Sequence, residues 1–445
     1  MNSFADLFLR ETAFPCECGQ THHIRTKRTL LGKEVLPQIP SVIQEINLGK
    51  KALLVYDQNT YQAAGKMVEE ILKESHYSVI PCLLTPQEES AYLEPDEEAR
   101  SQVGSFLSYQ PDFLLAVGSG VINDLTKFVA HRVNLPYAVV GTAPSMDGYP
   151  SPGAPMLVGG YKLTLDAQEP KAIFLDLDVL CQAPSLLIQA GWGDLVGKVT
   201  ANSDWCLRQE LLGEYRCEFS WKIVEKEIKS LSYQTEKIKE KAPSAIKVLA
   251  QALLVSGFSM SMVGDSRPAS SAEHQIAHYL EMMALHRRVH PSLHGLRVGV
   301  ATGLVQKIYG RFLEEMDHLP WSSSPKREPD LDQIKIHFGP LFPFLQKTVQ
   351  KKMTLSQEIH LKMAQSQTRK ALKQAITPKL LAIPQVTQAL AQAGAPTTFE
   401  ELGFSPTLIK DSLLFSRWVR DRYTIFDLLQ EVGLLEEYVN WLLEE

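Results

Sequence analysis

Between Lys51 and residue 183 the sequence alternates short apolar runs with segments of helical pattern. Parallel strands that are buried on both faces read as continuous apolar runs, and helices between them form the crossover connections. We therefore expect an α/β fold with a Rossmann-like parallel sheet in this part of the chain. The expected strands are 51–57, 78–84, 112–118, 136–143 and 172–180, and the expected helices are 59–74, one that ends near 109, and 121–132.

The pattern changes outside this region. Residues 1–50 read as a lead-in, and 144–170, which are rich in Pro and Gly, read as loop and hairpin. Beyond Pro184 the strand signal stops, and almost everything to Glu445 reads as helix. We therefore predict two domains, an α/β dinucleotide-binding domain over 1–183 and an all-helical domain over 184–445.

Composition excludes several classes of partner. The formal net charge of -6 favours neither nucleic acid nor an anionic membrane surface. The N-terminus has no basic and apolar signal pattern, and the six scattered cysteines fit reduced thiols in a cytoplasmic protein. The most apolar helix candidate, Val248 to Val263, is too short and too rich in Ser and Gln to span a bilayer, so we expect a buried core helix.

Two short motifs in the N-terminal half contain residues of the types that bind a metal or a phosphate group. Cys16 and Cys18 precede His22 and His23, but this spacing does not close a tetrahedral site easily, so an ordinary turn is favoured over a metal site. Further on, Gly118-Ser119-Gly120 lies between an expected strand and a helix, where glycines let the backbone approach a pyrophosphate.

The glycine motif is weak evidence by itself. Asn123 occupies the position of the third glycine of G-x-G-x-x-G, and a simple tight turn is about as plausible. Asp57 ends an expected strand, where a carboxylate can bind ribose hydroxyls and repel a 2′-phosphate, which favours NAD(H) over NADP(H). A carboxylate that only caps a helix is the alternative.

Five of the 12 histidines lie between Ser266 and Gly299. His274 and His278 are four residues apart in a helical pattern, so they share one face. His286, His290 and His294 have the same spacing, but Pro291 interrupts any single helix through them. The H-E-x-x-H pattern of zinc proteases is absent.

An acid that could join these imidazoles is Asp194. It lies among glycines, with Gly191 and Gly193 beside it, in an expected loop or helix start just past the predicted domain boundary. Glycines permit the close approach of another group, and ligand sites tend to lie between domains. The alternative is a carboxylate that caps a helix.

Several separate segments carry a resemblance to one family. The segments are GSGVINDLTK (118–127), TAPSMDGYPSP (142–152), GWGDLVGK (191–198), the SRPAS-x-x-EH block (266–274), LHGLRVGV (293–300) and RWVRDRYTIFDLLQEVGLL (417–435). They resemble the sn-glycerol-1-phosphate dehydrogenases, in particular the bacterial, arabinose-operon-associated branch. This family belongs to the dehydroquinate synthase-like and iron-containing alcohol dehydrogenase superfamily. The chain departs from the family pattern at Ser271, where a glycine is expected, and at Asp265, where a serine is expected.

The resemblance implies roles for individual residues. Asp194, His274 and His294 would be the three metal ligands and catalytic residues of the helical domain, and Asp147, Asp194 and His278 would contact substrate. A cationic His278 would help to bind the phosphate, with Arg267 as a second candidate unless it only holds a loop. His286 and His290 match nothing functional. The implied cofactor-binding residues are Asp57, Gly118, Ser119, Gly120, Val121, Ile122, Thr142, Ala143, Pro144, Ser145 and Ser151.

The implied activity is the interconversion of dihydroxyacetone phosphate and sn-glycerol 1-phosphate. NAD(H), or alternatively NADP(H), would carry the hydride, and a divalent ion, Zn or Ni or alternatively Fe, would act as Lewis acid on the substrate oxygen. A homodimer is expected by resemblance. The alternatives are another polyol dehydrogenase such as a glycerol dehydrogenase, a lyase like dehydroquinate synthase, and a dinucleotide-sensing binding protein without activity.

Overall fold

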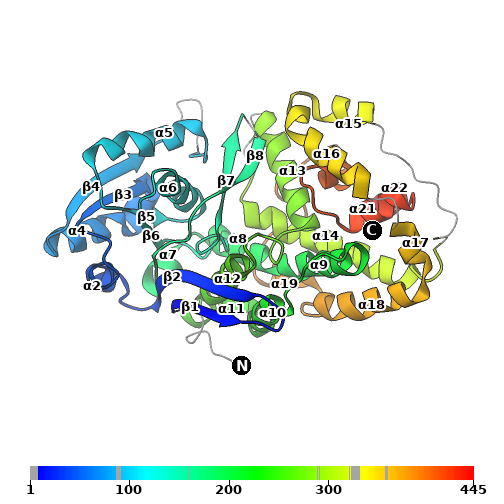
Figure 1. The fold of residues 1–445 in the computed structure, drawn as a ribbon, viewed down its shortest axis with the longest axis horizontal. Helices are drawn as coiled ribbons and strands as arrows, with labels where there is room; N and C mark the ends of the chain where they lie inside the picture. The colour runs from blue at the N-terminus through cyan, green and yellow to red at the C-terminus, as the bar shows by residue number, and fades with distance from the viewer. Residues whose placement is uncertain are drawn as a thin grey trace. The chain divides into compact units, whose positions relative to one another are not determined.

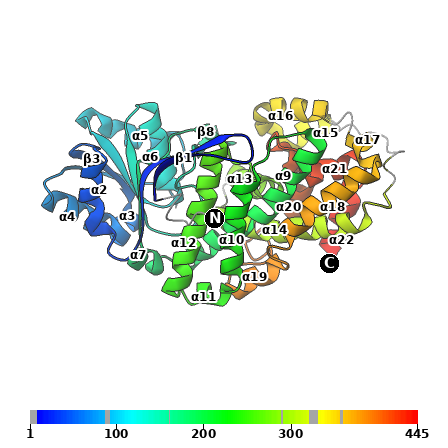
Figure 2. The ribbon, with the colours of Figure 1, turned by 60° about the horizontal axis from the view of Figure 1, so that its bottom comes forward.

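The computed structural model describes residues 9–86, 92–159, 161–287, 289, 291–319, 321, 331–355 and 359–444. The chain forms two compact units. The first unit comprises Met1–Leu195 and Phe219–Ser266, and the second comprises Val196–Glu218 and Arg267–Glu445. The first unit extends beyond residue 183, the domain boundary predicted from the sequence, because α12 (Pro243–Val263) packs against β2 (Thr21–Gly32) of its sheet (Figure 2).

A seven-stranded sheet forms the framework of the first unit (Figure 1). Its spatial order is β1-β2-β9-β6-β5-β3-β4. Along this order, every pair of neighbours after β2 is parallel, whereas β1 pairs with β2 in antiparallel fashion. The parallel α/β fold predicted from the apolar runs is therefore confirmed. The remaining strand bounds are β1 Arg10–Pro15, β3 Lys51–Asp57, β4 Ser78–Leu84, β5 Phe113–Gly118, β6 Tyr137–Gly141 and β9 Ala172–Asp176.

Helices and one separate hairpin complete this unit. Apolar residues of α2 and α4, such as Ile39, Val68 and Leu72, are fully buried in one cluster with sheet residues such as Phe113 and Phe174. The hairpin consists of β7 (Gly153–Val158) and β8 (Tyr161–Asp166). The helices are α2 Ile39–Glu45, α3 Gln58–Thr60, α4 Lys66–Glu74, α5 Glu97–Ser105, α6 Gly120–Arg132, α7 Leu177–Gln182, α8 Ser185–Val196, α10 Glu218–Ser232 and α11 Thr235–Lys239, with a π-helical turn at Tyr61–Gly65.

Two predictions about these elements were wrong. Residues 1–50 are not a mere lead-in, because β1 and β2 form a hairpin and β2 extends the central sheet beside β9. The alternating burial of His22, Ile24 and Thr26 is the strand signal that was missed. The last strand ends at Asp176 rather than at 180, because the side chain of Asp176 accepts a hydrogen bond from the Asp178 N–H and so begins α7.

The described residues of the second unit form helices joined by loops, without a strand, as predicted for this part of the chain. Helices α13 and α14 pack together, and α18 packs on α9. A buried ionic network lies near the C-terminus, where Asp427 accepts from Lys352 Nζ and Arg417 Nη1, both at 2.9 Å. The helices are α9 Lys198–Leu212, α13 Ala272–His286, α14 His294–Glu315, α15 Leu331–Phe338, α16 Phe342–Leu355, α17 Ile359–Ala364, α18 Ser366–Leu380, α19 Val386–Gln392, α20 Pro406–Phe415, α21 Ile425–Glu431 and α22 Leu435–Glu444.

Helix α12 is the one described helix that is long and apolar enough to cross a membrane. With 21 residues it is longer than the predicted helix, so the prediction that it is too short to span a bilayer was wrong. However, 72% of its most apolar window is buried inside the protein, which is the environment of a core helix.

Candidate active site

The predicted cofactor residues of the first unit lie after three neighbouring parallel strands. Asp57 ends β3, Gly118 ends β5, and the segment from Thr142 to Ser145 follows β6. The chain adds β4 on one side of β3 and then β5 on the other, so the strand order reverses between β3 and β5. In open α/β sheets ligands bind beyond the carboxyl ends of the strands at such a reversal.

The turn after β5 depends on its first glycine. A Cβ atom on Gly118 would lie 2.6 Å from Cβ of Ile122, so any other residue would push α6 away from the strand. Ser119 precedes the helix and its hydroxyl is hydrogen-bonded to the Ser145 hydroxyl, which joins the β5 turn to the segment after β6. The 13-residue helix α6 begins at Gly120 and presents its first N–H groups at this edge of the sheet.

Asp57 has a structural role that the sequence left open. Its Oδ1 atom accepts from the Thr60 N–H at 2.7 Å, and the Thr60 hydroxyl accepts from the Asp57 N–H at 3.0 Å. The residue therefore caps the helical segment after β3. This bond accounts for one carboxylate oxygen, and contact with ribose stays a prediction.

A buried lysine that the sequence analysis did not single out fixes the loop after the SMDG motif. Lys127 Nζ donates to the Gly148 carbonyl at 2.6 Å, to the Ser151 hydroxyl at 3.0 Å and to the Gly153 carbonyl at 3.2 Å. Burial lowers the pKa of Lys127, and burial also raises the pKa of its neighbour Asp124 to about 6. Ser151, a predicted cofactor residue, is thus a partner of this lysine.

Two predicted substrate residues meet within the first unit. The Asp147 N–H donates to Asp194 Oδ2 at 3.0 Å, and Asp147 Oδ2 accepts from the Ser256 hydroxyl at 2.7 Å. Both carboxylates are buried. A Cβ atom on Gly191 would lie 1.8 Å from the Pro144 carbonyl oxygen, so this glycine permits α8 to approach the segment after β6.

Asp194 lies in the last turn of α8 and not in a loop or helix start as predicted. The cap reading is therefore wrong, because a capping acid belongs at the first residues of a helix.

Three histidines of the second unit come together. His274 and His278 lie one turn apart on α13, and His294 is the first residue of α14. The ring centroids of His274 and His278 lie 5.2 Å and 5.1 Å from that of His294. The interruption at Pro291 thus separates the two helices, as predicted. His286 is exposed at the end of α13, and His290 lies outside the described residues.

The neighbour of His274 determines which of its ring nitrogens is available. Nδ1 lies 2.9 Å from Glu273 Oε1, and Glu273 also accepts from the Ser271 N–H at 2.7 Å and the Thr200 hydroxyl at 2.9 Å. Burial opposes ionisation of Glu273, but the hydrogen bonds from His274 and from the Ser271 N–H keep the pKa of Glu273 below its ordinary value. An ionised Glu273 holds the proton on Nδ1, so Nε2 of His274 carries the lone pair with which an imidazole binds a metal.

The departure from the family pattern at Ser271 does not strain the chain. Its φ of -152° lies outside the left-handed region that favours glycine. Its backbone N–H donates a hydrogen bond to Glu273, and its hydroxyl accepts one from Arg208 at 3.0 Å.

The cation beside His278 is an arginine that the sequence analysis did not single out. Arg420 Nη2 lies 3.1 Å from His278 Nε2. Because arginine only donates, Nε2 is the acceptor and His278 is neutral in this arrangement, contrary to the hypothesis of a cationic His278. Arg267, the other predicted phosphate partner, lies 3.4 Å from Glu214 and near the ring of Tyr215, which fits the loop-holding alternative.

Comparisons with known proteins agree with this fold. Residues 30–184 match the family described as iron-containing alcohol dehydrogenase. A butanol dehydrogenase from Thermotoga maritima, described as NADH-dependent, superposes with a TM-score of 0.59 at 16% identity and covers 98% of this chain and 99% of its own. A glycerol dehydrogenase from Schizosaccharomyces pombe gives 0.58 at 16% identity, over 94% of this chain and 90% of its own. The fold is therefore that of the iron-containing alcohol dehydrogenase class of oxidoreductases.

Sequence relatives define the family within this class. The glycerol-1-phosphate dehydrogenase [NAD(P)+] of Bacillus subtilis is 35% identical over 72% of this chain and 80% of its own length. The enzyme of the same name from Bacillus licheniformis is 29% identical over 96% and 95%, and that of Pyrococcus horikoshii is 33% identical over 64% and 79%. The chain belongs to the glycerol-1-phosphate dehydrogenase family.

Proposed function

We propose that this chain interconverts dihydroxyacetone phosphate and sn-glycerol 1-phosphate by hydride transfer with NAD(H) or NADP(H). The observation that carries the proposal is the family membership together with the pairing of two buried residues, Glu273 and His274, which gives His274 the tautomer that binds a metal through Nε2. The relatives' names favour this reaction over the alternative of a lyase or a dinucleotide sensor.

The proposed metal ligands are Asp194, His274 and His294. One carboxylate and two neutral imidazoles suit Zn, Ni or Fe(II). The fit rests on the donor set: a ring nitrogen of His274 lies within 4.8 Å of one of His294, and Asp194 is a buried carboxylate two residues before the chain enters the second unit. A bound divalent ion would act as Lewis acid on the substrate oxygen.

The chain's own residues would orient cofactor and substrate. The β5 turn and the start of α6 would hold the pyrophosphate on backbone N–H groups, and Asp57 would bind a ribose hydroxyl and disfavour a 2′-phosphate. Asp147, fixed by Ser256, would accept a hydrogen bond from a substrate hydroxyl. Glu273 would keep the His274 ring in one orientation throughout turnover.

Arg420 is the proposed phosphate-binding residue. Its guanidinium donates to His278 Nε2 and lies 3.4 Å from the Ser270 hydroxyl, and a guanidinium binds phosphate oxygens with charged hydrogen bonds. With Arg420 beside it, a neutral His278 can offer its ring to the substrate without a second positive charge. We further propose a cytoplasmic homodimer that prefers NAD(H) and holds Zn or Ni.

The test follows NADH absorbance with dihydroxyacetone phosphate and with unphosphorylated dihydroxyacetone. Arg420→Gln should raise the KM for the phosphorylated substrate and leave the KM for the unphosphorylated one nearly unchanged. Arg267→Gln is the matched control, because Arg267 is paired with Glu214. Equal rates on both substrates in the wild type would favour the alternative, a different polyol dehydrogenase of the same class.

A further inference from the structure

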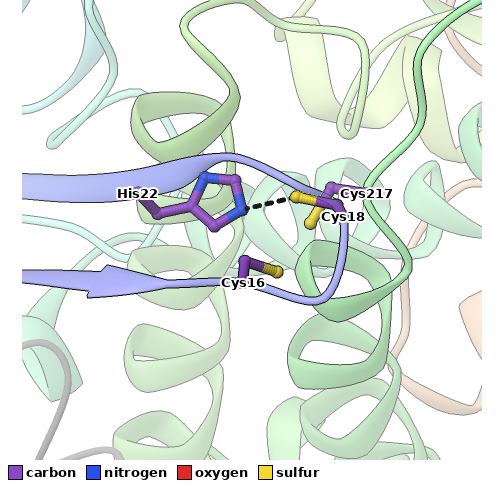
Figure 3. Close-up of side chains that lie close together, drawn as sticks. All are labelled: Cys16, Cys18, His22 and Cys217. Atoms are coloured by element: carbon purple, nitrogen blue, oxygen red, sulfur yellow. Dashed lines mark hydrogen bonds between the residues drawn. The ribbon is translucent and has the colours of Figure 1, made fainter.

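The turn between β1 and β2 brings together side chains of the types that bind metals. Cys16 and Cys18 are half-buried, and the alternation of the strand then buries His22 while His23 is exposed. Only one of the two adjacent histidines therefore faces the cysteines, which removes the difficulty that the sequence spacing raised. The sulfur atoms of Cys16 and Cys18 and a ring nitrogen of His22 lie within 4.8 Å of one another (Figure 3).

The tautomer of His22 is suited to metal binding. Its Nδ1 atom lies 2.8 Å from the carbonyl oxygen of Met262 in α12. Because a carbonyl only accepts, Nδ1 carries the proton and Nε2 has a lone pair. Nε2 faces the sulfur of Cys18 at 3.4 Å. Histidines that bind a metal usually donate their other ring N–H to a backbone carbonyl, a carboxylate or water.

A third cysteine directly precedes α10, the helix that packs against β1. The ring of Phe219 packs edge-on against that of Phe14 in β1, with centroids 5.5 Å apart. Cys217 is two residues before Phe219, a separation of at most about 7 Å between Cα atoms. Cys217 is fully buried.

We propose that Cys16, Cys18, His22 and Cys217 bind a structural zinc ion. Three thiolates and one imidazole form one of the closed tetrahedral sets that structural zinc uses. Ideal Zn–S and Zn–N bonds place sulfur and nitrogen about 3.6 Å apart along an edge of the tetrahedron, close to the 3.4 Å between Cys18 and His22.

The alternatives for this cluster are a disulfide and a set of thiols. None of the six cysteines, all of which lie in the described residues, forms a disulfide. Binding would displace three thiol protons to solvent and change no oxidation state. The ion would join the β1–β2 turn to the start of α10 and, through the Met262 carbonyl, to α12. None of its ligands belongs to the proposed active site.

The test compares metal content and cobalt spectra in five forms of the full-length protein. Cys18→Ser removes a proposed zinc ligand, and Cys181→Ser removes a half-buried thiol outside the cluster as the matched control. His294→Ala removes only the proposed active-site metal. Elemental analysis should find one metal ion fewer per chain in Cys18→Ser than in the wild type, and no change in Cys181→Ser.

Cobalt substitution distinguishes the two sites and does not depend on a variant that folds. Only thiolate ligands give sulfur-to-cobalt charge-transfer absorption, and the proposed active site contains none. Cobalt-loaded wild type and His294→Ala should both show this absorption, and His22→Cys should retain it. Its absence from the wild type, or a disulfide among these cysteines in freshly purified metal-free protein, would overturn the proposal.

Discussion

Glu273→Gln tests how the protein prepares His274 for metal binding. The substitution keeps the size of the side chain and an oxygen that can accept from the Ser271 N–H. It removes the negative charge 2.9 Å from His274 Nδ1. A hydrogen bond to a charged group contributes about 1.5–3 kcal/mol and a neutral one about 0.5–1.5 kcal/mol, so the loss is about 1–2 kcal/mol. This corresponds to a roughly 5- to 30-fold weaker metal affinity.

The assay is competition for the metal with a chelator of known affinity, followed by kcat at saturating metal. Loss of a side chain that hydrogen-bonds to a metal ligand usually lowers metal affinity or activity about 10–100-fold, which overlaps the expected range. Glu227→Gln is the control, because Glu227 is a mostly buried carboxylate bonded to Gln251 in the first unit. Unchanged metal affinity in Glu273→Gln, with the protein folded, would refute the role of Glu273.

Three further predictions concern stability. Asp427→Asn leaves two buried cations without their carboxylate and should lower the unfolding free energy by about 3–5 kcal/mol in urea, whereas Asp421→Asn, at a half-exposed ion pair, should cost at most about 1 kcal/mol; equal effects would contradict this. Gly191→Ala should reduce both thermal stability and cofactor affinity because its Cβ would lie 1.8 Å from a carbonyl oxygen, while Gly310→Ala, with open space around it, should be neutral or stabilising in the same melting assay; a wild-type-like Gly191→Ala would be inconsistent with the packing. Burial raises the pKa of Asp204 from 3.8 to about 6, so the folded state binds a proton more tightly than the unfolded state. The stabilising contribution of Asp204 is therefore present below about pH 4 and falls by roughly 3 kcal/mol as pH rises through 6. The difference in unfolding free energy between wild type and Asp204→Asn should fall over that range, and a constant difference would disprove the shift.

The sequence predicted the central strands well because their apolar runs are determined by burial on both faces. KALLVYD and SVIPCLL form β3 and β4 with the predicted bounds. The N-terminal hairpin was missed because its strands are half exposed and its alternation is interrupted by charged residues. Long-range pairing, here between β2 and β9, depends on residues more than 140 positions apart, which local patterns do not reveal.

The candidate site shows the same division between local and distant information. Spacing placed His274 and His278 on one helix face and separated His294 at Pro291. Arg420 was not singled out because it lies 142 residues from His278 in the sequence. Glu273 was passed over although it adjoins His274, because its role appears only in the hydrogen bond to Nδ1. An ordinary turn was favoured for Cys16, Cys18 and His22 because of their spacing, and Cys217 was not considered with them because it is far along the chain.

The most direct test of the proposed reaction is NADH oxidation by metal-depleted protein with dihydroxyacetone phosphate before and after Zn or Ni is added back, with the chirality of the product determined. We predict negligible turnover without metal, recovery on its addition, and sn-glycerol 1-phosphate as the product. His294→Ala should stay inactive under both conditions. Full turnover without metal, or formation of the opposite enantiomer, would contradict the proposed function.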